Sequence, residues 1–199
     1  MKEMIKNTGI MLAITLIAGL VLGFIYQITK EPIAEQNARK KQEACQEVFQ
    51  DAASFEPVEV REPDAAAWTA EGYGDERVDE VMSALDDSGS LLGYVITVTT
   101  REGYGGDIQF AIGVKDDNTM NGISILTIAE TAGLGMKADT DEFKSQFADK
   151  NVEKFEYTKN GATEDSQIDA LSGATITTNA MVNGVNAGLC AFTYEKGGN

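Results

Sequence analysis

An uninterrupted apolar segment near the N-terminus constrains this chain more than any other feature. Residues 8–29 form a 22-residue stretch without a charged side chain. At 1.5 Å rise per residue, a helix of this length crosses the roughly 30 Å hydrocarbon core of a bilayer. Its glycines, which would weaken a soluble helix, are common in transmembrane helices. We therefore predict one transmembrane helix at 8–29, preceded by a short N-terminal tail at 1–7.

A cleaved signal peptide is the alternative to an anchor. The apolar region of a signal peptide is usually only about 7–15 residues long, and a small-x-small cleavage site follows it. Here the chain continues after Tyr26 as QITKEPIAEQ, which has no such site. We therefore expect the helix to stay as a single-pass anchor in the lipid bilayer. Lysine and arginine flank it on both sides, at 2 and 6 before it and at 30 and 39–41 after it, so charge alone leaves its orientation open.

Composition excludes several classes of chemistry. Acidic residues outnumber basic ones 32 to 16, and the net charge of -16 repels nucleic-acid backbones. The chain has no histidine, which excludes Ser–His and Cys–His nucleophile pairs and imidazole-ligated metal or haem. Two cysteines, Cys45 and Cys190, are too few for a four-thiolate iron–sulfur cluster, and the sequence does not decide whether they pair. Any redox chemistry would therefore depend on an organic cofactor.

The rest of the chain divides into three parts. Residues 30–50 are polar and helix-prone, which predicts a juxtamembrane helix that continues from the membrane or is kinked at Pro32. Residues 51–90 are acidic, with several prolines and glycines, and predict an irregular subdomain with a short helix around 76–85. Residues 91–199 contain the strand signals and the clearest soluble helix.

The strand signals predict an antiparallel sheet. Runs rich in β-branched residues lie at 91–100, 108–114 and 123–128. A turn at 115–122 joins the last two, and Asn121-Gly122 within it is a hairpin signal. Short connections imply antiparallel pairing, since parallel strands need a long crossover. Two helices are predicted at 139–148 and 178–193, the second capped by Thr177 or Thr178, and a weaker strand at 154–157. The fold class is therefore α+β: one transmembrane helix followed by an antiparallel sheet with packed helices.

Two segments have the residue types of a ligand site. The first is Asp169-Ala-Leu-Ser-Gly-Ala-Thr-Ile-Thr177, directly before the last helix, where unsatisfied N–H groups and the helix dipole suit a phosphate. The second is Glu130-Thr-Ala-Gly-Leu-Gly-Met136, where two glycines let the backbone approach a flat ligand and Leu134 can pack on its face. Tyr104-Gly-Gly106 is a weaker candidate of the same kind. By spacing alone, ordinary turns account for these segments more readily than a ligand site does.

Together these segments resemble the FMN-binding domain family. The run at 169–175 is similar to its flavinylation motif, D-x-x-[S/T]-G-A-T, and 130–135 is similar to its E-T-P-G-L-G motif, with Ala132 in place of proline. Gly103-Tyr-Gly-Gly106 and the single N-terminal helix resemble the G subunits of Rnf electron-transport complexes, which are related to the C subunits of sodium-translocating NADH:quinone reductases. The resemblance covers the anchor and about 98–194 well, and 51–90 poorly.

The resemblance implies a covalent FMN, joined by its phosphate to Thr175 by a flavin transferase. It also implies binding by the remaining residues of both motifs: Asp169, Ser172, Gly173, Ala174, Thr177, Glu130, Thr131, Gly133, Leu134 and Gly135. It further implies an electron-relay subunit of an ion-translocating ferredoxin:NAD+ oxidoreductase, without substrate chemistry of its own. Its partners would be the other membrane and peripheral Rnf subunits. The chain would lie in the cell (inner) membrane, with a cytoplasmic N-terminus at 1–7 and an extracytoplasmic flavin domain at 91–199.

Two other functions stay open at this point. One is a flavin module of a different extracytoplasmic reductase or of a redox sensor. The other is a flavin-free anchored scaffold, which fits the composition alone. The presence or absence of flavin on Thr175 separates the scaffold from the rest.

Overall fold

The computed structural model describes residues 1–59, 68–69 and 71–197, except for the side chains of 195–197. The chain forms two compact units, Met1–Lys41 and Gln42–Asn199. The expected irregular acidic stretch falls partly on 60–67 and 70, which lie outside the described residues.

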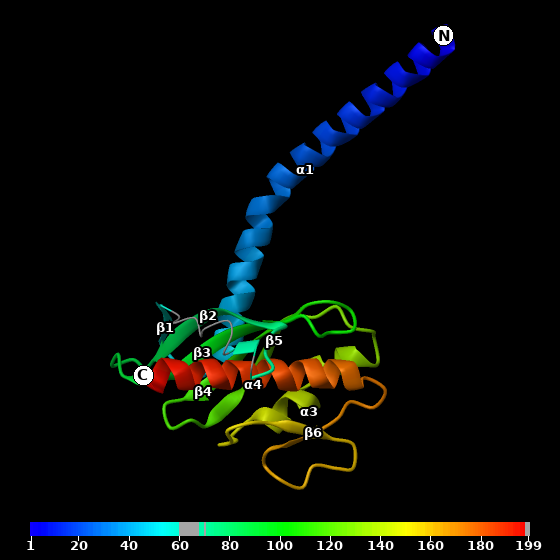
Figure 1. Ribbon diagram of the computed structural model, residues 1–199. Coiled ribbons are helices and arrows are strands. Elements are labelled where there is room, and N and C mark those ends of the chain that lie inside the picture. The colour runs from blue at the N-terminus through cyan, green and yellow to red at the C-terminus, as the bar shows by residue number, and fades with distance from the viewer. Residues whose placement is uncertain (60–67, 70, 198–199) are drawn as a thin grey trace. The chain divides into compact units, whose positions relative to one another are not determined.

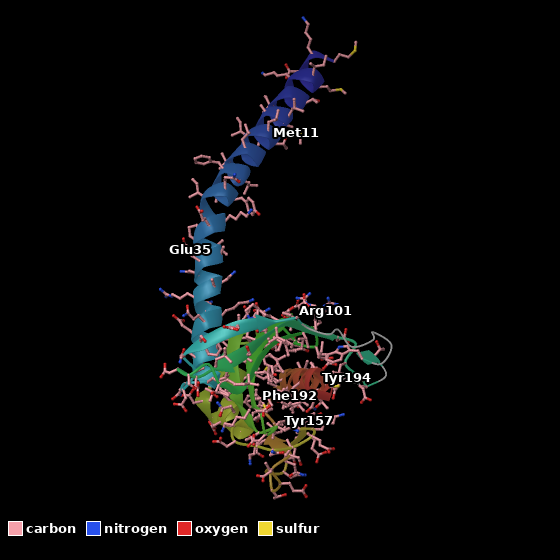
Figure 2. The ribbon with its side chains drawn as sticks, turned by 90° about the vertical axis from the view of Figure 1, so that its left-hand side faces the viewer. Met11, Glu35, Arg101, Tyr157, Phe192 and Tyr194 are labelled. Atoms are coloured by element: carbon pink, nitrogen blue, oxygen red, sulfur yellow. The ribbon has the colours of Figure 1, made fainter. Side chains whose placement is uncertain are left out.

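Helix α1 spans Lys2–Val48 and stays continuous through Pro32, which is one of the two expected possibilities. It contains the apolar stretch at 8–29, and among the described residues it is the helix long and apolar enough to cross a membrane. The hydroxyls of Thr8, Thr15 and Thr29 donate to carbonyls four residues earlier, at 2.9–3.0 Å, so these polar groups are satisfied within the helix. Side chains such as Met11 project outward along its length (Figure 2).

A five-stranded antiparallel sheet is the framework of the second unit. Its strands are β1 (Ser54–Val58), β2 (Glu76–Leu85), β3 (Leu91–Thr100), β4 (Ile108–Lys115) and β5 (Met120–Thr127), paired in chain order. The three strands predicted from β-branched runs are confirmed as β3, β4 and β5, and the predicted α+β class is confirmed with them. Alternation of the side chains gives the sheet two apolar faces.

Helix α4 (Thr175–Gly197) packs across one face of this sheet (Figure 1). Its apolar side includes Met181, Val185 and Leu189, which pack in one core with strand residues such as Phe110 and Ile112. The approach is close, because a Cβ at Gly188 would lie 2.4 Å from Cδ1 of Ile112.

The last turns of α1 cover part of the other face. Ala44, Cys45, Val48 and Phe49 are buried there, together with strand residues Ala84, Val95 and Ala111. Among the described residues neither cysteine forms a disulfide: Cys45 is buried in this cluster, with its Sγ 3.8 Å from the Met82 sulfur, and Cys190 is half-buried on α4. The end of the long helix is therefore part of the core of the second unit.

Short elements connect β5 to α4. They are the 3-10 helix η1 (Gly135–Asp139), α3 (Asp141–Lys144), the 3-10 helix η2 (Ser145–Phe147) and the parallel pair β6 (Glu156–Thr158) and β7 (Gln167–Asp169). Three buried rings hold them to the core: Phe147 packs edge-on against Phe143 at 5.6 Å and against Phe155 at 5.2 Å between ring centroids.

The predicted helix at 76–85 is wrong, because these residues form strand β2. The strand pairs with β1 on one side and β3 on the other. This pairing satisfies its backbone N–H and C=O groups, which in a helix would have bonded within the segment. We expected the domain that contains the sheet to start at residue 91. The sheet instead begins at Ser54, with β1.

The turn predicted at 115–122 is confirmed, but its position at Asn121-Gly122 is wrong. Both residues lie in β5, where Gly122 has φ +146° beside a β-bulge and Asn121 donates a side-chain hydrogen bond to the carbonyl of Val48. The hairpin turns instead at Asp116–Asn118, with Asn118 at φ 69° and the Asp117 carboxylate accepting from the Thr119 N–H at 2.9 Å. Asn121, which local turn chemistry favours for a hairpin turn, thus bonds to the end of α1 instead.

Two helix boundaries also differ from the prediction. The expected helix at 139–148 is broken into η1, α3 and η2, and Thr140 rather than Asp139 precedes α3. Helix α4 begins at Thr175, three residues before the expected start, so neither Thr177 nor Thr178 caps it. Their hydroxyls have partners within and beside the helix instead, as described next.

Candidate functional site

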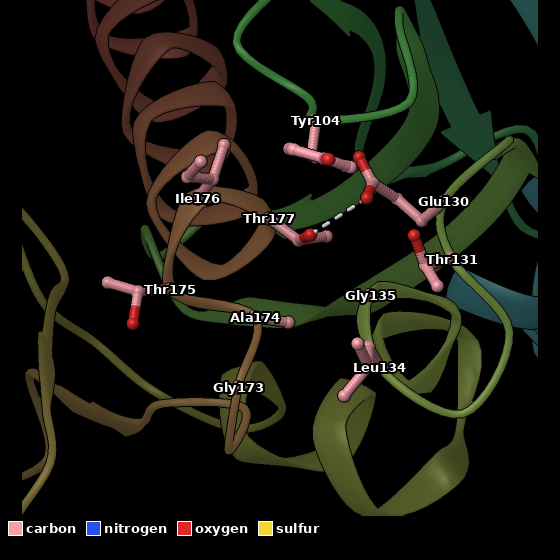
Figure 3. A pocket seen from close by; sticks show the side chains of 10 residues that line it. All are labelled: Tyr104, Glu130, Thr131, Leu134, Gly135, Gly173, Ala174, Thr175, Ile176 and Thr177. Carbon is pink, nitrogen blue, oxygen red and sulfur yellow. Dashed lines mark hydrogen bonds between the residues drawn. The ribbon is translucent and has the colours of Figure 1, made fainter.

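A cavity of about 590 Å³ lies where the N-terminus of α4 meets the two loops that follow β3 and β5 (Figure 3). This volume is in the range of small-molecule pockets in proteins. The lining residues come from three separate parts of the chain: Tyr104; Glu130, Thr131, Leu134 and Gly135; and Gly173, Ala174, Thr175, Ile176 and Thr177.

Glu130 joins these three parts. Its buried carboxylate accepts a hydrogen bond from the backbone N–H of Gly105 at 3.1 Å and another from the hydroxyl of Thr177 at 3.0 Å. The first bond fixes the loop after β3 and the second fixes the first turn of α4. Charge-assisted hydrogen bonds of this kind are stronger than neutral ones, so Glu130 stabilises the cavity wall.

Two glycines keep the backbone close to the cavity. A Cβ at Gly135 would lie 2.6 Å from both Oε2 of Glu130 and Oγ1 of Thr177, so no larger residue fits without displacing that pair. Gly173 has φ +76°, a conformation that other L-residues adopt only with strain, and Leu134 lies directly beside it. The chain therefore enters α4 through a tight turn, with its backbone exposed to the cavity.

The hydroxyl groups around the helix start differ in their availability. Thr177 and Thr178 are buried, and the Thr178 hydroxyl donates to the carbonyl of Ala174 and accepts from the N–H of Leu171, each at 3.0 Å. Thr175 is half-buried at the cavity, and Ser172 is exposed just outside it. Within the described part of the chain, neither of these last two hydroxyls has a hydrogen-bond partner. Of the hydroxyls around the start of α4, Thr175 is thus the available one on the cavity wall.

Large apolar side chains surround the mouth of the cavity. Tyr104 is 72% exposed, Ile176 54% and Leu134 43%. Elsewhere in this unit large apolar side chains are mostly buried. Apolar surface around a concave site is typical of sites for flat aromatic ligands, while the first turn of α4 offers N–H groups to an anion.

Eight of the eleven residues expected to bind the cofactor line this cavity. They are Glu130, Thr131, Leu134, Gly135, Gly173, Ala174, Thr175 and Thr177. Ser172, Gly133 and Asp169 do not line it. The carboxylate of Asp169 accepts from the N–H of Ala162 at 2.6 Å, and its backbone N–H donates to Gln146 at 2.6 Å, so Asp169 holds the strand that leads into the motif.

Two lining residues were not among the expected ones. Tyr104 belongs to a glycine-containing loop that was noted only as a weaker candidate, and its exposed ring becomes meaningful only beside the other two segments. Ile176 had one signal in the sequence, since it is an apolar residue within a run of hydroxyl-bearing residues. Among the described residues no group of three or more histidine, cysteine or acidic side chains forms a metal site.

Comparison with known families finds two matches along the chain. Residues 103–189 match the FMN-binding domain, and residues 1–48 match the RnfG N-terminal region. The first match contains every residue that lines the cavity, and the second coincides with α1.

Relatives resemble the chain over almost its full length. It is 32% identical to the G subunit of the ion-translocating oxidoreductase complex of Methanosarcina acetivorans, covering 98% of each chain. It is 30% identical to the G subunit of the Na(+)-translocating ferredoxin:NAD(+) oxidoreductase complex of Acetobacterium woodii, covering 96% of this chain and 92% of the relative. Among solved structures, the fold is similar to the C subunit of the Na(+)-translocating NADH-quinone reductase from Parabacteroides distasonis, with TM-score 0.51, 24% identity, and 73% and 77% of the two chains covered.

Proposed function

Because this chain belongs to the family of G subunits of ion-translocating oxidoreductase (Rnf) complexes, with an FMN-binding domain, we propose that it relays electrons through an FMN covalently bound at Thr175. The complex would be a ferredoxin:NAD+ oxidoreductase, as named for the Acetobacterium woodii relative. The observation that carries the proposal is the free hydroxyl of Thr175 on the wall of the cavity.

The choice of Thr175 rests on the hydroxyls around it. Esterification by the FMN phosphate requires a hydroxyl that can lose its proton and that a transferase can reach. Thr177 and Thr178 are buried and hydrogen-bonded, so modification of either would break contacts that hold α4 in place. Thr175 has neither restriction. A phosphate there would also lie beside the N–H groups of the first helical turn, which favour an anion.

The remaining residues of the cavity suit the ring of the cofactor. When bound, FMN supplies one- and two-electron redox chemistry. Leu134, Ile176 and Tyr104 offer apolar and aromatic surface to a flat ring, and contact with the ring would bury side chains that are otherwise exposed. Glu130 holds the two walls in place through its bonds to Gly105 and Thr177. We assign Thr131, Gly135, Gly173 and Ala174 to the same binding surface, with Ser172 and Gly133 in the turns beside it and Asp169 as a support.

The anchor and the covalent bond fit one location. We infer that residues 8–29 of α1 span the cell membrane once, with the N-terminus inside and the FMN domain outside. Outside the cytosol a flavin that dissociated would be lost, and a phosphoester bond prevents this loss. The domain would exchange electrons with other Rnf subunits, and a flavin transferase would attach the cofactor during maturation.

Mass spectrometry of the full chain from its native membrane tests this proposal. An FMN-sized adduct on Thr175 is the expected result, and Thr175→Ala should lose it with little change in stability, because the hydroxyl has no partner to lose. Thr127→Ala is the matched control, since it removes an exposed threonine hydroxyl on β5 that does not line the cavity. An adduct that persists in Thr175→Ala would move the site to Ser172. An unmodified 169–178 peptide, from cells that contain the transferase, would contradict a covalent FMN relay.

A further inference from the structure

Glu76, the first residue of β2, has a buried carboxyl group that is only half satisfied. The residue is 5% exposed, and its Oε1 accepts a hydrogen bond from the hydroxyl of Thr100 at 3.1 Å. Its buried Oε2 has no hydrogen-bond partner among the described residues. The desolvation cost is large for a charged carboxylate in this position and much smaller for a protonated carboxyl group. The surroundings of Glu76 therefore favour a bound proton.

Glu102 provides a second carboxylate beside the first. Its Oε2 accepts from the side-chain amides of Asn179 at 3.2 Å and Asn183 at 2.6 Å, both on α4. Its backbone N–H donates to the Thr100 hydroxyl at 3.3 Å, and that same hydroxyl donates to Glu76. Thr100 thus joins the two acidic residues through a single oxygen atom.

The elements packed around Glu76 provide little positive charge. The loop before β2 contributes Asp75, the buried ring of Tyr73 and the indole N–H of Trp68, which donates to the Glu76 carbonyl at 3.0 Å. Thr100 comes from the end of β3, the exposed Arg101 follows it, and α4 contributes the two asparagines. Within the described residues neither Glu76 nor Glu102 forms a salt bridge. Burial first, and then the negative charge of Glu102, raise the pKa of Glu76 to about 7, and Asp75 adds to the rise.

Glu102 lies at the start of the loop that carries Tyr104 into the wall of the cavity proposed for FMN. Glu102 is adjacent to Gly103, where a Cβ would lie 3.0 Å from Oε1 of Glu130. Asn179, which holds Glu102, follows Thr175 by four residues, or about 6 Å along the helix axis. Negative charge added in the cavity would reach the pair mainly through protein, where electrostatic effects are weakly screened.

We propose that Glu76 and Glu102 form a proton-accepting pair that takes up one proton when an electron enters the cavity and releases it when the electron leaves. This inference rests on the proposed function. The electron comes from a donor subunit of the complex, and the proton comes from solvent and forms one O–H bond on the pair. Near neutral pH Glu76 is already protonated in part of the molecules, and in the remainder proton uptake makes the charge of the pair one unit less negative, which offsets the charge of the electron. Glu76 is the carboxyl group that binds the proton, and the negative charge of Glu102 strengthens its hold on that proton.

Infrared difference spectroscopy on the full flavinylated chain is the test, with reduction by dithionite near neutral pH. The expected result is a protonated-carboxyl band that grows on reduction in the native chain and is lost in Glu76→Gln. Glu102→Gln should shift or weaken the band, since it removes the neighbouring charge. Glu56→Gln is the matched control, because Glu56 is an exposed acid on β1 of the same sheet and its loss should leave the band unchanged.

A second readout does not need the cofactor. In flavin-free Thr175→Ala protein, a ¹³C NMR titration should place the midpoint of the Glu76 carboxyl near neutral pH, and Glu102→Gln should lower that midpoint. If Glu76→Gln does not fold, the lowered midpoint expected in Glu102→Gln still tests the inference. A Glu76 carboxyl that titrates in the ordinary acid range, or a flavinylated chain whose carboxyl bands do not change on reduction, would overturn the inference alone. A native chain without flavin on Thr175 would overturn the proposed function and this inference with it.

Discussion

Gly135→Ala tests whether the close packing of the cavity wall holds the start of α4. The added methyl group would lie 2.6 Å from Oε2 of Glu130 and from Oγ1 of Thr177, about 0.8 Å short of an ordinary 3.4 Å contact. Because Glu130 is buried and bonded to Thr177, the methyl group must push the two apart. Overpacking of this kind costs about 1–3 kcal/mol, and a buried carboxylate that loses one donor costs about as much. We expect a net loss of about 2–3 kcal/mol in the free energy of unfolding.

Urea denaturation of the full chain in detergent measures this loss. Trp68 is the single tryptophan, and its contacts with Tyr73 and the Glu76 carbonyl make its fluorescence a reporter for the folded second unit. The urea midpoint should fall without a change in slope, because the mutation alters stability and not the surface exposed on unfolding. The same displacement should reduce flavin attachment, since it moves the first turn of α4.

Gly74→Ala is the matched control. A Cβ at Gly74 would lie 3.8 Å from its nearest neighbour, an ordinary contact, so its stability should stay within about 0.5 kcal/mol of the native value. If Gly135→Ala unfolds at the native urea concentration and carries normal flavin, then the Glu130–Thr177 contact does not support the cavity, and our account of that wall is wrong.

Two further predictions concern the same region. Thr177→Val keeps the side-chain volume but removes the donor to Glu130, so it should lower the stability by about 1–3 kcal/mol in the same urea assay, whereas Thr177→Ser should retain most of it. The pH dependence of stability should show the raised pKa of Glu76: its contribution is complete below the ordinary pKa of about 4.5 and is lost as the pH rises through about 7. After allowance for solvent screening this amounts to about 2 kcal/mol, and Glu76→Gln should make the stability profile flatter between these pH values. A native profile that instead rises steadily from pH 4.5 to 7 in parallel with that of Glu76→Gln would contradict the second prediction.

Local sequence patterns predicted the elements whose stability is itself local. The apolar run at 8–29 lies in a helix, as expected, because a membrane-length apolar segment must satisfy its backbone hydrogen bonds within itself. The β-branched runs at 91–100 and 108–114 lie in strands because hydrophobic burial and strand propensity act in the same direction there. The segment at 76–85 differs, because pairing with the neighbouring strands β1 and β3, which lies outside the segment itself, decided the outcome. Asn121-Gly122 differs for a related reason: α1 supplies a carbonyl that Asn121 binds, and this contact is remote in sequence.

The sequence by itself determined that the chain has one membrane-length apolar helix, an α+β domain without histidine chemistry, and two glycine-containing motifs suited to a phosphorylated flat ligand. Only the tertiary structure decided that these motifs face one cavity and that Tyr104 and Ile176 belong to it. It also decided that the hydroxyls of Thr177 and Thr178 are hydrogen-bonded, whereas the hydroxyl of Thr175 has no partner within the described residues. It also decided the pairing of Glu76 with Glu102. The physical reason is the same in each case. Composition and spacing fix which chemistry a residue can perform, whereas burial and the remaining hydrogen-bond partners fix whether it is available, and both of these arise from segments far apart along the chain.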